Sequence, residues 1–79
     1  MPRFFFHLHN DVDCPDDEGV ELPDLEAARV HASRTARFTA GETVKDHGHI
    51  VGDHRIDIEN GDGQVLDSVY FRDAVKIEV

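Results

Sequence analysis

The feature that most constrains the fold is a hairpin pattern in the second half of the chain. Residues 53–59 alternate in polarity, which places Ile56 and Ile58 on one face of a strand. Residues 60–63 read Asn-Gly-Asp-Gly and supply the residues that tolerate positive φ in a tight turn. Residues 64–71 follow as the returning strand, so this region predicts two antiparallel neighbours in a sheet.

The facing of the returning strand is open to two interpretations. Alternation directs three of its apolar side chains inward: Val65, Val69 and Phe71. Leu66 and Tyr70 are also large, but they alternate to the opposite face. The tail at residues 74–79 predicts either a fourth strand or a short turn that ends in an extended edge.

The amino-terminal segment predicts another strand at residues 3–9, because aromatic residues are enriched in strands. Alternation gives it one face with Phe4, Phe6 and Leu8 and another with Phe5, His7 and His9. Residues 10–21 then form a polar loop that holds six acids and no base. Within and just after this loop, residues 20–22 allow a short extended piece before Pro23.

A helix is predicted over residues 24–40. Proline is tolerated in a first turn, and Asp24 favours the positive end of the helix dipole. One narrow stripe follows helical spacing: Leu25, Ala28, Ala32, Ala36, Thr39 and Thr43. These small side chains would let the helix approach a sheet closely. Gly41 weakens the helix by about 1 kcal/mol relative to alanine, and Gly48 is the stronger stop signal.

Together these elements predict an α+β fold: a small antiparallel sheet of three to four strands, in the order β-α-β-β, with one helix packed across one face. The chain is 79 residues long, which predicts a single domain over residues 1–79. A domain of this size buries only about 60% of the surface that its unfolded chain exposes, so its stability is marginal.

The charge distribution excludes several classes of partner. The formal net charge is −9, and six of the 17 acids lie in residues 10–21, which leaves 11 acids against 8 bases elsewhere. Few and scattered Lys and Arg argue against nucleic acid and against anionic membrane surfaces. The single cysteine, Cys14, rules out an internal disulfide. With no apolar run long enough for a signal peptide or a membrane span, the chain is predicted to be cytoplasmic.

Two groups of side chains invite a metal interpretation. His7 and His9 share a strand face, and three further candidate ligands follow them closely: Asp11, Asp13 and Cys14. His47, His49 and His54 gather after the helix, where favourable interaction with the helix dipole explains the first of them. Neither group has the spacing of a closed four-ligand site, and the acidic loop lacks the spacing of an EF-hand. We therefore expect no metal and no cofactor.

Catalysis has little support in the sequence. Cys14 lies among carboxylates, which disfavour its thiolate, and neither Ser33 nor Ser68 stands in a nucleophile-elbow context. Residues 61–63 are a turn and no phosphate loop, because no helix with a lysine follows them. The sequence predicts that the protein is not an enzyme.

The face of the helix opposite the small stripe suggests an interface. Val30, Arg34, Arg37 and Phe38 lie on that face, and aromatic residues together with arginine are enriched at interface centres. In the alternative interpretation Phe38 folds over the edge of the sheet, or the helix rotates to bury it.

Four segments carry a family resemblance: MPRFFFHL at residues 1–8, DEGVELPDLEAAR at 17–29, IENGDG at 58–63 and FRDAVKIEV at 71–79. In this order they resemble domain-of-unknown-function family 6894, a family of short bacterial proteins frequent in alphaproteobacteria. The resemblance covers nearly the whole chain. It implies a small stand-alone domain and no assigned activity.

A second likeness is to antitoxins of the HicB type, which share an amino-terminal strand, a Leu-Pro-Asp step and a following helix. The chain lacks their second strand and their Gly-Thr step before the helix. The leading interpretation is therefore a non-enzymatic module that binds a protein partner or a second copy of itself. An antitoxin-like regulator and a small metal-binding protein are the alternatives.

Overall fold

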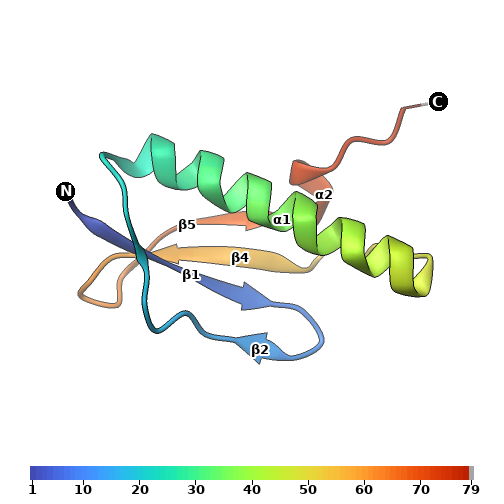
Figure 1. Cartoon of the computed structure of the whole chain (residues 1–79), viewed down its shortest axis with the longest axis horizontal. Coiled ribbons are helices and arrows are strands. Elements are labelled where there is room, and N and C mark those ends of the chain that lie inside the picture. The colour runs from blue at the N-terminus through green and yellow to red at the C-terminus, as the bar shows by residue number, and fades with distance from the viewer. Residues whose placement is uncertain (79) are drawn as a thin grey trace.

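An antiparallel sheet forms one layer of the protein, and a long helix lies across one face of that sheet (Figure 1). The computed structural model describes residues 1–78. In chain order the elements are β1 (Arg3–His9), β2 (Asp13–Cys14), β3 (Val20–Glu21), α1 (Leu25–His47), β4 (Arg55–Glu59), β5 (Val65–Tyr70) and α2 (Phe71–Ala74). The predicted α+β class, with one long helix on an antiparallel sheet, is confirmed.

The sheet has the order β2-β1-β4-β5, and β3 pairs with the start of β1. In the predicted hairpin, β4 and β5 pair from Arg55↔Tyr70 to Ile58↔Asp67 and then shift, so that Glu59 faces Val65. Leu66 is the extra residue of this bulge. The two-residue strands β2 and β3 raise the number of strands above the predicted three to four, because the acidic loop folds back along the free edge of β1.

Asp16 holds this loop against β1. Its Oδ2 accepts a hydrogen bond from the Phe6 amide at 3.1 Å, and its Oδ1 accepts from the amides of Glu18 and Gly19 at 3.1 and 3.0 Å. The Asp16 amide in turn donates to Nδ1 of His7 at 3.0 Å. The carboxylate therefore replaces a strand partner at the centre of the β1 edge, between β2 and β3.

Helix α1 is longer than predicted and runs through Gly41 to His47. Asp24 caps its start by accepting from the Ala27 amide at 2.9 Å, and Gly48 ends it with φ 74° while donating to the Val44 carbonyl at 2.8 Å. The cost of Gly41 is small beside these caps and the packing of the helix on the sheet. Four alanines make the buried stripe: Ala28, Ala32, Ala36 and Ala40.

The core lies between α1 and the sheet. Its largest fully buried side chains are Ile56, Ile58 and Phe71. Phe71 is inward as predicted, but it begins α2 and does not belong to the strand. The predicted inward facing of Val65 is wrong, since this side chain is 52% exposed next to the bulge.

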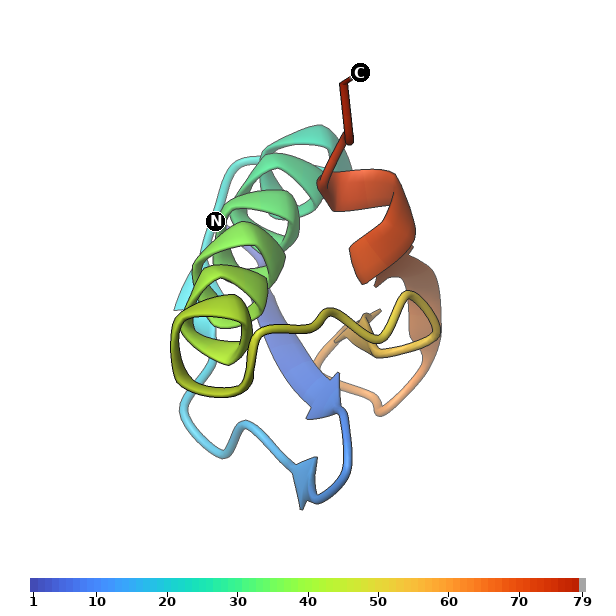
Figure 2. The same cartoon turned by 90° about the vertical axis from the view of Figure 1, so that its right-hand side faces the viewer.

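The fourth strand, one of the two alternatives predicted for residues 74–79, is not formed in the part of the tail that the structure describes. Residues 71–74 form the short helix α2, and residues 75–78 belong to no strand. Val79 lies outside the described residues. Both helices lie on the same side of the sheet, which leaves the opposite sheet face uncovered (Figure 2).

Candidate functional site

The outward face of α1 is the first candidate surface. Its alanine stripe faces the sheet, which turns Phe38 and Val30 toward solvent with 72% and 45% of their surfaces exposed. Arg34 lies exposed between them at helical spacing. The alternative in which Phe38 is buried at the sheet edge is wrong. We refer to Val30, Arg34 and Phe38 as the outward face.

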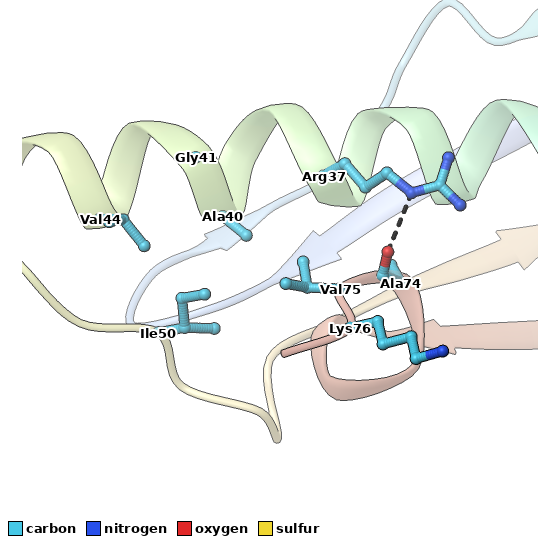
Figure 3. A pocket seen from close by; sticks show the side chains of 8 residues that line it. All are labelled: Arg37, Ala40, Gly41, Val44, Ile50, Ala74, Val75 and Lys76. Carbon is cyan, nitrogen blue, oxygen red and sulfur yellow. Dashed lines mark hydrogen bonds between the residues drawn. The ribbon is translucent and has the colours of Figure 1, made fainter. Parts of the chain in front are cut away.

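A groove lies beside this face, between the second half of α1 and the segment around α2 (Figure 3). Its volume is about 570 Å³. The residues that line it are Arg37, Ala40, Gly41, Val44, Ile50, Ala74, Val75 and Lys76. The Nε–H of Arg37 donates to the Ala74 carbonyl at 2.9 Å and so ties α1 to α2 at one end of the groove.

A second hollow of about 310 Å³ adjoins the groove and shares Ile50 and Val75 with it. It continues over Phe71 and Ile77, and the Ile77 side chain is 81% exposed. The apolar surface therefore extends from α1 around α2. Exposed apolar surface of this kind is typical of binding sites for proteins or small molecules.

A polar network occupies the uncovered sheet face. His7 and His9 of β1 lie beside the acids of β4, with His7 Nε2 at 3.3 Å from Glu59 Oε2 and His9 Nε2 at 3.0 Å from Asp57 Oδ2. His9 Nδ1 lies 3.0 Å from Oδ1 of Asp13. Since Nδ1 of His7 accepts from a backbone amide, Nε2, on the side of Glu59, is the ring nitrogen that carries the proton.

Asp57 is the buried member of this network and is 8% exposed. Its Oδ1 accepts from the Ser68 hydroxyl at 2.6 Å and from Arg55 Nε at 3.0 Å. Burial, the largest single influence, would raise the pKa of Asp57, but these two hydrogen bonds favour the charged form. The positive charges of Arg55 and His9 act in the same direction, and the pKa is lower than usual for an aspartate.

Asp16 has the same character on the edge of β1. Burial would raise its pKa, but the amides of Gly19, Phe6 and Glu18 favour the charged form, so its pKa is also lowered. Both carboxylates accept hydrogen bonds from neighbouring groups of the fold. This indicates that they stabilise the structure.

Replacing Asp57 by asparagine should reveal this arrangement as a pH-dependent loss of stability. A carboxyl with a lowered folded pKa stabilises the protein above its unfolded pKa, near 4, and the contribution is lost as the pH falls through the folded value. We expect wild type to exceed Asp57→Asn by about 1–2 kcal/mol at pH 7. Urea unfolding at pH 7, 5 and 3 measures this difference, with Asp62→Asn in the exposed hairpin turn as the control. A difference that persists unchanged at pH 3 contradicts this assignment.

The histidine groups do not assemble into a metal centre in the part of the chain that the structure describes. No group of three or more His, Cys, Asp or Glu side chains in residues 1–78 could hold a metal ion. His47 and His49 stack on each other with ring centroids 6.0 Å apart, while His54 packs edge-on against Phe71 at 5.7 Å. The absence of bound metal stays a prediction, to be tested by elemental analysis.

Of the four residues predicted to form an interface, the structure keeps three together on the outward face and turns Arg37 toward the groove. The rest of the groove was missed. Ile50 comes from a segment that carries no motif, and Ala74, Val75 and Lys76 come from the tail, where the family resemblance assigns no binding role. The one signal available was that Val44 and Ile50 are apolar residues placed around the helix stop at Gly48.

Comparison of the sequence with protein-family models shows which family the chain belongs to. Residues 3–72 match the family described as a domain of unknown function (DUF6894). The protein belongs to this family. Searches of curated proteins and of solved structures gave no match. The DUF6894 match spans all the strands and α1, together with the first residues of α2.

The DUF6894 match ends before the tail that closes one side of the groove, at residues 74–76. None of the helices among residues 1–78 is long and apolar enough to cross a membrane.

Proposed function

We propose that this protein is a non-enzymatic interaction module that binds protein through its helix layer, most simply a second copy of itself. The observation that carries the proposal is the outward face, where the Phe38 side chain is 72% exposed on the helix α1. Aromatic side chains beside arginine are the composition that dominates binding energy at interfaces. The groove next to this face supports the proposal by extending the exposed apolar surface.

The polar groups of the protein fit a binding role better than a catalytic one. All fully buried side-chain nitrogen and oxygen atoms among residues 1–78 have a hydrogen-bond partner. The pKa values of Asp57 and Asp16 are lowered, and hydrogen bonds within the fold contribute to both shifts. Catalytic acids and bases usually have pKa values moved toward the working pH instead. The exposed free thiol of Cys14 supports a reducing compartment, and a cytoplasmic location is part of the proposal.

Replacing Phe38 by aspartate should weaken binding and leave the fold intact. The side chain contributes little to the core, so the free energy of unfolding should change by about 0.5 kcal/mol or less. In a complex the new carboxylate would lose its hydration, which reduces self-association or capture of a partner. Gly61→Asp is the matched control, because it adds the same charge at an exposed turn where a side chain meets open space.

Sedimentation velocity, affinity capture from native extract and circular dichroism melts would measure mass, partners and fold for both variants. A Phe38→Asp protein that unfolds would make the outward face part of the core. A folded Phe38→Asp protein with the mass and partners of wild type would also contradict the proposal.

A further inference from the structure

The residues that line the groove determine which chemical groups it can bind. Six of its lining residues are apolar or glycine, and Arg37 and Lys76 are the charged ones among the described residues. Both lie at the end of the groove next to Ala74 (Figure 3). Arg37 is fixed there by its bond to the Ala74 carbonyl, while Lys76, whose side chain is 85% exposed, pairs with the exposed Glu78 at 3.8 Å. An occupant with an apolar side chain next to a carboxylate would complement this lining.

The turn between β1 and β2 has that composition. Val12 at its centre is 68% exposed, although it is apolar, and it stands between Asp11 and Asp13. The side chains of these two acids are 91% and 77% exposed. We call residues 10–13 the tip.

The tip is held in one shape before anything binds. The Val12 amide donates to Oδ1 of Asn10 at 3.0 Å, and Asp13 begins β2. Asp11 Oδ1 lies 3.5 Å from Nε2 of His54. A preorganised turn loses little conformational entropy when it docks, so even a small apolar contact can contribute to binding.

The tip and the groove lie at the same end of the molecule. The pair between Asp11 and His54 joins the tip to the loop between α1 and β4, and Ile50 of this loop lines the groove. Figure 2 looks onto this end and shows the β1–β2 turn, the loop after α1 and α2 together. Two copies related by a twofold axis can therefore make the same contact twice, once in each direction.

We propose that the tip of one copy docks in the groove of a second copy, with Val12 in the apolar part and a neighbouring aspartate toward Lys76 and Arg37. This inference rests on the proposed function, since it names the surfaces through which the protein associates with itself. The net charge of −9 makes two copies repel each other at long range. Salt weakens both the repulsion and the docking pairs, so salt dependence does not test the proposal.

The first test compares two Val→Lys variants by sedimentation equilibrium over increasing protein concentration. Val12→Lys places a cation in the apolar part of the groove and removes an apolar contact, and we expect it to weaken self-association by about tenfold or more. Val65→Lys is the matched control, because Val65 is an exposed valine that faces Glu59 at the other hairpin. It should associate as wild type does. Equal behaviour of the two variants would overturn the proposal.

The second test reverses charges on both surfaces. Asp11→Lys alone and Lys76→Glu alone should each weaken self-association, because each places like charges together in the complex. The double variant restores opposite charges and should recover most of the wild-type association. Circular dichroism melts confirm that each variant is folded, which both exposed positions favour. The docking arrangement would be refuted if the double variant associated no better than either single variant.

The outcomes separate this inference from the proposed function. Self-association that depends on Phe38 but not on Val12 or Lys76 would overturn the docking of the tip and keep the interaction module. Wild-type protein that stays monomeric at every concentration would overturn the docking as well. In that case the proposed function depends on capture of a different protein through Phe38.

Discussion

Replacing Phe71 by alanine should unfold much of the protein, whereas the same replacement at Phe38 should leave it folded. Phe71 is 1% exposed and is one of the largest fully buried side chains, and Phe38 is 72% exposed. A buried Phe→Ala change costs about 3–5 kcal/mol, as much as the whole stability of a small domain with roughly 5 kcal/mol. At the exposed position the change should stay within about 0.5 kcal/mol.

Circular dichroism and urea unfolding of the two variants measure these effects. Phe71→Leu adds an intermediate case, because it keeps most of the buried volume and should remain folded with reduced stability. Similar losses at the two phenylalanines would contradict the observed packing, in which Phe71 lies in the core and Phe38 lies on the side of α1 opposite the alanine stripe.

The second large effect is expected at Gly19, in the loop that covers β1. This glycine has φ +72°, and an added Cβ would lie 2.8 Å from the Phe4 carbonyl oxygen. Gly63 has a similar φ of +81°, but a Cβ there meets nothing within 4 Å. Gly63→Ala should therefore cost about 1–2 kcal/mol from the backbone conformation alone. Gly19→Ala should cost about 1–3 kcal/mol more, because the loop must move away from β1.

Hydrogen exchange gives this comparison a local measurement. The Phe6 amide donates to Asp16, so displacement of the loop in Gly19→Ala should speed exchange at Phe6 well beyond the change in global stability. Gly63→Ala should leave Phe6 exchange tied to global stability. Equal costs for the two glycines would show that the loop does not press on β1 at Gly19.

The hairpin and the helix could be predicted because local patterns determine them. Residues 60–63 supply the turn, and the capping residues Asp24 and Gly48 bracket a helix whose small side chains repeat at helical spacing. The outward position of Phe38 was one of two alternatives that the helical pattern allowed. Its spacing from the alanines follows from helix geometry alone.

The groove could not be predicted because its walls meet only in the folded chain. Arg37 and the Ala74 carbonyl are 37 positions apart, and the contact depends on residues 71–74 turning into a helix immediately after β5. A strand pattern through residues 64–71 hides that turn. The pairing of the loop at residues 10–21 with β1 could not be predicted for a related reason, since an aspartate that accepts from three backbone amides looks like any other acid in the sequence.

The buried alanines of α1 have a consequence for how the helix finds its position along the sheet. They recur every four residues from Ala28 to Ala40, so the helix presents nearly the same surface after sliding by about 6 Å along its axis. The packing energy of the alanines alone would be nearly the same in helix positions that differ by such a step. The bond from Arg37 to the Ala74 carbonyl and the pair of Arg29 with Asp67, 2.6 Å apart, distinguish them. Polar contacts at or near the surface add little stability, yet here they select one of several similar helix positions.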